Sequence, residues 1–274
     1  MLKRIIRGGL RRAGFEVRRL SKDPEVKRAY PFVSEVTLAG MNFHYWIKDE
    51  AAEKWYVPEE HENLVEDHIL ADLVRPGDRV LDVGCHHGFY LSFLAKLVGP
   101  KGFVLGVDIN PENVMIAQAQ LALNGTTGWC QVLHRAVSAS AAKELGYSEC
   151  TNSSVVLPGE ERGGTVQATT VDNLCLDHGD FDILMVDVEG FEEEVLRGAA
   201  DMLDRRKPAL AVEIHSDFLQ RYGSTLESLT LAGRFSRYLG RMVLRSVDRN
   251  QNLPFQLDAL PSTGISNVFL KPLS

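Results

Sequence analysis

Short continuous apolar runs alternate with segments of helical periodicity along most of the chain. Such runs, bounded by turn residues, are typical of strands buried on both faces, and apolar residues three and four positions apart are typical of the helices that cover them. The alternation predicts an α/β fold with a mostly parallel sheet and helices on both faces. The clearest predicted helices are 89–98, 111–125 and 191–197, and the predicted strands are 80–83, 102–107, 130–134, 183–186, 209–214, 241–247 and 265–270.

Two segments ahead of this alternation have patterns of their own. Residues 33–47 alternate between apolar and polar side chains around Gly40, which predicts a β-hairpin. Residues 59–73 end an acidic stretch and predict a helix that leads into the first strand of the sheet. We therefore expect an N-terminal extension over residues 1–58 and one large domain over residues 59–274.

The first 20 residues differ from the rest in charge. They contain seven Lys and Arg and one Glu, a charge of +6, which leaves −13 for the remainder of the chain. Apolar residues recur there every three or four positions with basic residues between them, which is a basic amphipathic pattern. Two interpretations stay open: a helix on an anionic membrane surface, or a terminal helix packed on its own domain or on a partner subunit of a homo-oligomer.

The composition is that of an ordinary globular protein, with 45% hydrophobic and 24% charged residues. No apolar run approaches the roughly 20 residues of a membrane span, and the basic N-terminus is not built as a signal peptide. The four cysteines are scattered without metal-binding spacing, which suits a reducing cytoplasm. We expect a cytoplasmic protein, with residues 1–20 at the inner membrane face as the alternative, and no nucleic-acid substrate, because the main domain is acidic.

Polar residues collect directly after the predicted strands. Open α/β sheets bind ligands at the carboxyl ends of their strands, so these residues mark the expected binding face. Segment 138–164 is rich in Ser, Gly, Glu and Asn without periodicity, and we expect it to be a variable excursion over that face. The residues at the strand ends are Asp82, Asp108, Asp187, Glu189 and His215.

The loop after the first strand has the form Asp82-x-Gly84-x-x-x-Gly88. Its glycines would let the backbone turn and approach a ligand that a side chain would exclude, and the following helix would stabilise a carboxylate. The middle glycine of a dinucleotide fingerprint is missing, which disfavours NAD and FAD. Asp108 ends the second strand, where a carboxylate can accept both hydroxyls of a ribose. A nucleoside without phosphate fits this pattern, and S-adenosylmethionine is such a molecule.

The sequence resembles the FkbM-type S-adenosylmethionine-dependent methyltransferases over roughly residues 59–215. The family often has Asn where His86 stands and Lys where Met185 stands, so a polar contact near the cofactor and a charge near the acceptor differ here. The resemblance rests on Val80-Leu81-Asp82-Val83-Gly84 with Gly88, Val107-Asp108-Ile109-Asn110-Pro111-Glu112-Asn113, Val171-Asp172-Asn173-Leu174, Asp187-Val188-Glu189-Gly190-Phe191-Glu192 with Val195-Leu196-Arg197-Gly198-Ala199, and Lys207-Pro208 with Glu213-Ile214-His215.

This resemblance implies a Rossmann-like class I methyltransferase fold with a seven-stranded sheet. It further implies S-adenosylmethionine as the cofactor and a hydroxyl of a sugar, glycan or secondary metabolite as the methyl acceptor. Asp82, Gly84 and Gly88 would hold the methionine end, Asp108 the ribose, and Ala136 would lie near the adenine. The expected cofactor site is completed by Cys85, His86, Asn110 and Asp187.

Methyl transfer to an alcohol gains roughly 10²- to 10⁴-fold from a base that takes the hydroxyl proton. His215 and Glu189 are the candidate bases, and Asp187 is a candidate contact to cofactor or acceptor. The acidic residues could instead cap the following helix, and His215 could be a buried structural histidine. With Glu213 these residues could also bind a divalent cation, but no ligand spacing requires one, so no metal is expected.

Two further functions share the same cofactor residues. One is N-methylation of an amine or peptide, and the other is non-catalytic cofactor binding by a regulatory protein. Trp46, Trp55 and Tyr56 either stack on an acceptor sugar or pack in the core or in a lid. The sequence favours O-methylation of a small molecule or glycan over these alternatives.

Overall fold

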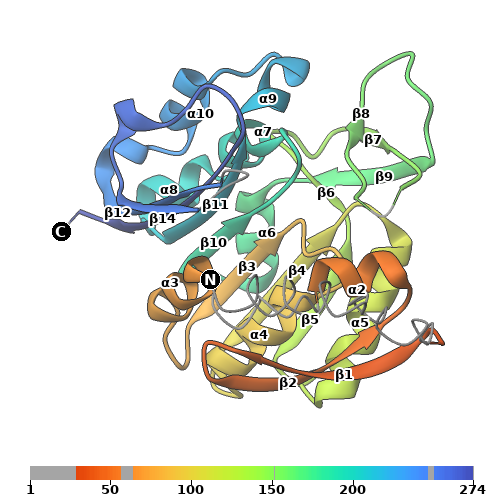
Figure 1. Ribbon diagram of the computed structural model, residues 1–274. Coiled ribbons are helices and arrows are strands. Elements are labelled where there is room, and N and C mark those ends of the chain that lie inside the picture. Colours follow the sequence, from red (N-terminus) through yellow and green to blue (C-terminus); the bar gives the residue numbers. More distant parts are fainter. Residues whose placement is uncertain (1–28, 57–63, 151, 246–249, 274) are drawn as a thin grey trace, which may run out of the picture.

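The apolar runs form one large sheet of eight strands, one more than the seven expected (Figure 1). The computed structural model describes residues 29–56, 64–150, 152–245 and 250–273. Residues 1–20, with their predicted amphipathic helix, lie outside the described residues. The strands are β3 (Arg79–Val83), β4 (Phe103–Asp108), β5 (Cys130–His134), β10 (Ile183–Val186), β11 (Ala209–His215), β12 (Tyr238–Leu244), β13 (Gln251–Pro254) and β14 (Ile265–Pro272).

The strand order is β13-β12-β14-β11-β10-β3-β4-β5. β5, β4, β3, β10 and β11 run parallel, whereas β14 is antiparallel to both of its neighbours and β13 pairs antiparallel with the end of β12. The chain leaves β3 toward β4 on one side and returns to β10 on the other, so the strand order reverses between β3 and β10. A switch point of this kind opens a crevice at the carboxyl ends of the strands.

Helices cover both faces of the sheet, as the apolar runs predict (Figure 1). One layer contains α3 (Val65–Leu73), α4 (Phe89–Val98) and α5 (Pro111–Asn124), and its core includes Phe89, Leu91 and Val114. The predicted helix 59–73 begins at Val65 within the described residues. The other layer contains α6 (Val171–His178), α7 (Glu192–Arg197), α8 (Ala200–Arg205), α9 (Ser216–Leu219) and α10 (Leu226–Ala232).

The predicted hairpin is formed by β1 (Phe32–Leu38) and β2 (Met41–Ile47), joined by a turn at Ala39 and Gly40. Both turn residues have positive φ angles, +45° and +79°, which suits a two-residue hairpin turn. The hairpin packs on α4 and α5, where Phe43 and Tyr45 are buried in the same core as α4. Gln120 of α5 exchanges two hydrogen bonds with the backbone of Trp46, at 2.9 and 2.8 Å.

Two segments differ from the prediction. A helix that the sequence pattern did not predict, α2 (Glu50–Tyr56), follows the hairpin. Segment 138–164 holds strands β7 (Glu144–Tyr147) and β8 (Val155–Val156), which join β6 (Ala136–Val137) and β9 (Gly164–Thr169) in a second sheet of order β6-β9-β7-β8. These strands have only four and two residues and are mostly half-buried, so no long apolar run predicts them. Among the described helices, none combines the length and apolar character of a bilayer span.

Candidate functional site

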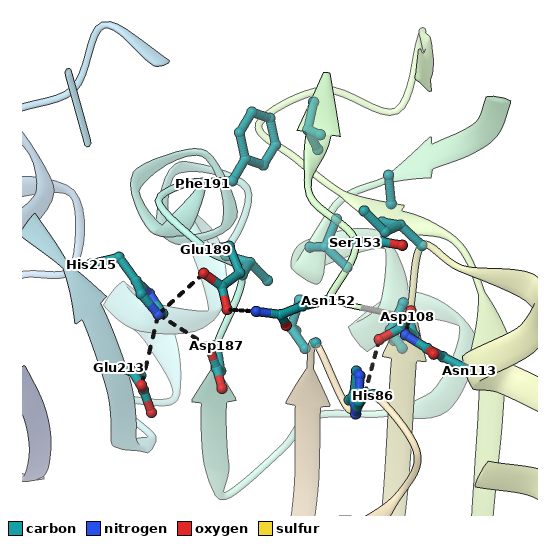
Figure 2. Close-up of a pocket in the computed structure, with 18 of the residues that line it drawn as sticks. His86, Asp108, Asn113, Asn152, Ser153, Asp187, Glu189, Phe191, Glu213 and His215 are labelled. Atoms are coloured by element: carbon teal, nitrogen blue, oxygen red, sulfur yellow. Dashed lines mark hydrogen bonds and ion pairs between the residues drawn. The ribbon is translucent and has the colours of Figure 1, made fainter. Parts of the chain in front are cut away.

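A cavity of about 450 Å³ opens at the carboxyl ends of β3, β4, β10 and β11 (Figure 2). Its walls come from the two strand-end loops beside the switch point, from α2, and from the excursion around residue 153. Seven residues predicted for the site line it: Gly84, His86, Asp108, Ala136, Asp187, Glu189 and His215. The switch point therefore collects most of the strand-end polar residues in one place.

Gly84 and Gly88 have positive φ angles of +91° and +77°, as the sharp turn after β3 requires. Their lack of a side chain serves contacts within the protein. A Cβ on Gly84 would lie 1.8 Å from the carbonyl oxygen of Asp187, and one on Gly88 would lie 2.9 Å from the Cβ of Ala117 in α5. Both glycines therefore allow β10 and α5 to pack against the loop. Gly84 also lines the cavity, whereas Gly88 does not, so close approach of a ligand at Gly84 stays a prediction.

Four residues predicted to contact the cofactor are absent from the cavity wall. Asp82 lies inside the sheet on β3, and the Cys85 thiol packs 3.0 Å from where a Cβ of Gly106 would be. Gly88 faces α5, as described above. Asn110 caps α5 by accepting from the amide of Glu112, and its own amide donates to Ser153 at 2.8 Å. Of these four residues, Asn110 contacts the wall directly, through Ser153.

Asp108 forms one end of the cavity. Its Oδ2 accepts from the backbone N–H of His86 at 2.9 Å, and its Oδ1 accepts from the N–H of Asn110 at 2.8 Å and from the Asn113 amide at 3.2 Å. Burial raises the pKa of Asp108 to about 6, against the lowering effect of these donors. Buried Asp82, on the neighbouring strand, has its pKa raised to about 7 by burial and by the Asp108 charge. This end is therefore a carboxylate site with one face toward the cavity.

Helix α2 closes the wall next to this end. Tyr56 hydrogen bonds the Nδ1 atom of His86, and Trp55 meets the same imidazole at a ring distance of 5.5 Å. His86 has a φ of +48°, an uncommon conformation for a residue with a side chain, so its backbone is held by these neighbours. Trp55 is 44% exposed and lines the cavity, as does Phe218, which is 47% exposed. Of the two alternatives for these aromatic residues, packing describes Tyr56, whereas stacking of Trp55 on an acceptor stays a prediction.

The other end of the cavity follows from the pairing of β10 and β11. Val186 lies opposite Val212, which places Asp187 next to Glu213. Glu213 and His215 are two positions apart on β11, so both side chains point to the same face of the sheet. Glu189 has a φ of +55°, which turns it back toward the strand end.

His215 is at the centre of this group and is only 4% exposed. Its Nδ1 lies 2.8 Å from Oε1 of Glu192, a fully buried residue at the start of α7. Its Nε2 faces carboxylate oxygens of Glu189, Glu213 and Asp187 at 3.5, 3.7 and 3.9 Å (Figure 2). Burial alone would lower the pKa of His215, but the hydrogen bond to Glu192 and the surrounding carboxylates raise it to about 9.

Asn152 connects the two ends. Its amide donates to Oε1 of Glu189 at 2.6 Å, and Ser153, the next residue, contacts Asn110 beside Asp108. Figure 2 shows Glu189 between His215 and Asn152. Asn152 and Ser153 belong to the excursion that was expected to lie over the binding face, and this position is confirmed.

Sequence reasoning missed Glu192, Asn113, Asn152 and Arg245 at the site. Arg245 lies 3.1 Å from Oε1 of Glu213 and 3.8 Å from Oε1 of Glu66, so it balances part of the negative charge. Glu192 was assigned only to a family motif, although an acidic residue three positions after the strand-end Asp-x-Glu is a signal that could have identified it. Asn152 and Arg245 have no such signal, because only the folded chain brings them to the cavity.

The family model of the methyltransferase FkbM domain matches residues 82–238, more than half of the chain. The chain belongs to the FkbM methyltransferase family. The predicted resemblance is thereby confirmed, as are the enzyme class and S-adenosylmethionine as its cofactor. The matched range includes both ends of the cavity but leaves out the hairpin and also α2, which contributes the wall around Trp55.

Matches to curated proteins are shorter. The chain is 33% identical over 84 residues to a ribosomal RNA large subunit methyltransferase E of Syntrophobacter fumaroxidans, covering 28% of this chain and 42% of that protein. It is 47% identical over 58 residues to the nocamycin O-methyltransferase of Saccharothrix syringae, covering 20% of this chain and 21% of that protein. The chain thus spans less than half the length of these curated relatives.

A solved structure of methyltransferase FkbM from Methylobacillus flagellatus is similar at a TM-score of 0.43 and 14% identity. The similarity covers 81% of this chain and 55% of that chain.

Proposed function

We propose that this FkbM-family chain transfers the methyl group of S-adenosylmethionine to a hydroxyl oxygen of a sugar, glycan or hydroxylated secondary metabolite. The observation that carries the proposal is the single cavity with two different ends. One end presents the carboxylate of Asp108, and the other presents His215 among carboxylates. A cofactor and an acceptor bound at these ends would meet near Glu189.

The cofactor end suits a nucleoside with a cationic tail. Asp108 faces the cavity with a carboxylate that can accept the ribose hydroxyls, and Ala136 with Val137 offers an apolar surface for the adenine. The sulfonium and ammonium charges would lie beside the loop at Gly84, within reach of the negative field of Asp187 and its neighbours. Bound in this way, S-adenosylmethionine supplies a methyl group already activated by its positive sulfur.

Glu189 is the residue we assign as the general base. It lies between the two ends of the cavity, and Asn152 fixes its Oε1 at 2.6 Å. His215 is less suited, because its Nδ1 is held by Glu192 and the ring is 4% exposed. Asp187 is left as a contact to the acceptor or to the cofactor charge.

The chain's residues then have three tasks in the reaction. The cavity walls hold the acceptor oxygen in line with the methyl carbon and the sulfur, and positioning of this kind supplies on the order of 7 kcal/mol or more of the acceleration. Glu189 takes the hydroxyl proton as the carbon–oxygen bond forms and the carbon–sulfur bond breaks, which contributes roughly 10²- to 10⁴-fold. Trp55 and the excursion at Asn152 exclude water from the transfer point.

Similarity to ribosomal RNA methyltransferases does not extend the proposal to RNA. The chain has a net charge of −7, and its acceptor end is lined by carboxylates that would repel phosphates. A neutral or cationic acceptor fits that end better.

The test uses methyl-labelled S-adenosylmethionine and a panel of sugars, glycans and hydroxylated metabolites. We expect label to enter an ether oxygen, and we expect Glu189→Gln to lower kcat about 10²- to 10⁴-fold while cofactor affinity measured by calorimetry is unchanged. Label entering only amines, with a small effect of Glu189→Gln, would refute O-methylation, since an amine already carries a usable lone pair. Absence of cofactor binding would refute methyl transfer altogether.

A further inference from the structure

The acceptor end holds more negative charge than deprotonation of one hydroxyl requires. Asp187, Glu189, Glu192 and Glu213 all place a carboxylate oxygen within 4 Å of the ring nitrogens of His215. We infer that Asp187, Glu213 and His215 bind one divalent metal cation of the Mn²⁺ type at the acceptor end of the cavity. The role given to the metal rests on the proposed function, whereas binding of the metal can be measured without methyl transfer.

The spacing of the three donor atoms is the first argument. One carboxylate oxygen each of Asp187 and Glu213 and Nε2 of His215 lie within 4.8 Å of one another. With Nε2 at 3.9 and 3.7 Å from the two oxygens, a point equidistant from all three lies about 2.1–2.5 Å from each, in the range of cation–ligand bonds. A cation therefore fits among the donors without a rearrangement of the strands.

The orientation of His215 is the second, independent argument. The Glu192 carboxylate binds Nδ1 at 2.8 Å, the arrangement by which a carboxylate behind a metal-bound histidine fixes its tautomer. Nε2 then points to the cavity. His215 is 4% exposed, and among the described residues Nε2 forms no hydrogen bond but faces carboxylate oxygens of Glu189, Glu213 and Asp187 at 3.5, 3.7 and 3.9 Å. A divalent cation that replaces the proton on Nε2 would be held by this nitrogen and by the carboxylates around it.

The chemistry of the set indicates which cation. Two carboxylates and one imidazole suit Mn²⁺ and related ions better than Ca²⁺, which prefers oxygen ligands alone. Three protein ligands leave positions open toward the cavity. An acceptor hydroxyl bound there would be acidified by the metal, and Glu189, which is not needed as a ligand, would receive its proton. The metal would thus orient the acceptor and assist the base proposed above.

Arg245 balances part of the negative charge at the acceptor end. Its guanidinium lies 3.1 Å from Oε1 of Glu213 and 3.8 Å from Oε1 of Glu66, and the residue also lines the cavity. One guanidinium beside the carboxylates around His215 leaves an excess of negative charge at this end, where the cation would bind.

The experiment is calorimetric titration of the full chain, freed of metal by a chelator, with Mn²⁺ in the absence of cofactor and acceptor. Electron paramagnetic resonance of the same samples counts free Mn²⁺. We expect one saturable site in the micromolar range, with affinity lowered at least tenfold in Glu213→Gln and in His215→Gln. Asp201→Asn, an exposed acidic residue of α8 remote from the cavity, is the control and should bind as the parent does.

His215 is buried and the Glu213 side chain is only 14% accessible, so Asp187→Asn provides a variant with a more exposed side chain, 40% accessible, should either of the others fail to fold. Absence of saturable binding below millimolar Mn²⁺, or equal affinity in the folded ligand variants, would overturn the inference. Methyl transfer by a chain that binds no Mn²⁺ would overturn the metal site and leave the proposed function standing. Mn²⁺ binding at this site without methyl transfer to any acceptor would keep the metal site and contradict the proposed function.

Discussion

Replacing Gly84 by alanine tests why the loop after β3 needs a glycine. The added Cβ would lie 1.8 Å from the carbonyl oxygen of Asp187, so the ends of β3 and β10 would have to separate. The hydrogen bond from the Asp187 amide to the Val83 carbonyl, 2.9 Å long, crosses the same point. A left-handed backbone in alanine costs about 1–2 kcal/mol, and overpacking adds about 1–3 kcal/mol. We expect Gly84→Ala to lower the free energy of unfolding by about 2–5 kcal/mol.

Gly77 provides the matched control. Its φ of +93° is close to the +91° of Gly84, but a Cβ there would meet nothing within 4 Å. Gly77→Ala should therefore show only the backbone cost of about 1–2 kcal/mol. Both variants are compared with the parent by denaturant unfolding without cofactor. Equal losses in the two variants, with cofactor binding lost only in Gly84→Ala, would refute the packing argument and restore a ligand-contact role for Gly84.

Three further predictions concern the cofactor, the core and the base. The ionised form of Asp108 accepts the ribose hydroxyls, and with a pKa of about 6 only about one-tenth of Asp108 is ionised at pH 5. The affinity for S-adenosylmethionine, measured by calorimetry, should therefore fall about tenfold from pH 7 to pH 5. The same fall in Asp108→Asn would contradict this explanation. Phe89→Ala removes a ring that is 2% exposed and stacks on Tyr56, so denaturant unfolding should show a loss of about 3–5 kcal/mol, and a loss below 1 kcal/mol would count against the packing described. Asn152→Ala frees Glu189 and should lower kcat in the methyl-transfer assay while stability changes by less than about 0.5 kcal/mol; an unchanged kcat would remove Asn152 from the mechanism.

The buried elements could be predicted from the sequence because burial imposes a pattern on them. β5 and α4 have the predicted bounds: β5 buries Cys130 and Val132 on one face, and α4 is a helix that buries seven of its ten residues. β13 escaped prediction because its residues are mostly exposed, so nothing in its composition separates it from a loop. β7 and β8 escaped prediction because they contain only four and two residues, too few for a pattern of alternation.

The candidate site likewise contains some residues that could be predicted from the sequence and others that could not. Asp108, Asp187 and His215 could be placed because each directly follows or ends a recognisable strand, and parallel strands bring their carboxyl ends together. The glycines were recognised as essential for the turn, but the atoms they approach belong to β10 and α5, which only the sheet order reveals. Asn152 was unpredictable because its position is set by the second sheet.

The two ends of the cavity and its outer wall differ in how the chain supports them. Asp108, Asp187 and His215 stand on strands whose apolar neighbours form the core, whereas Trp55 and Asn152 belong to a short helix and a loop outside the main sheet. Substitutions at the wall can therefore accumulate with little effect on folding. Evolution, or laboratory selection, has in the excursion beside Glu189 a region where new acceptors can be acquired while the strands that hold the cofactor end stay unchanged.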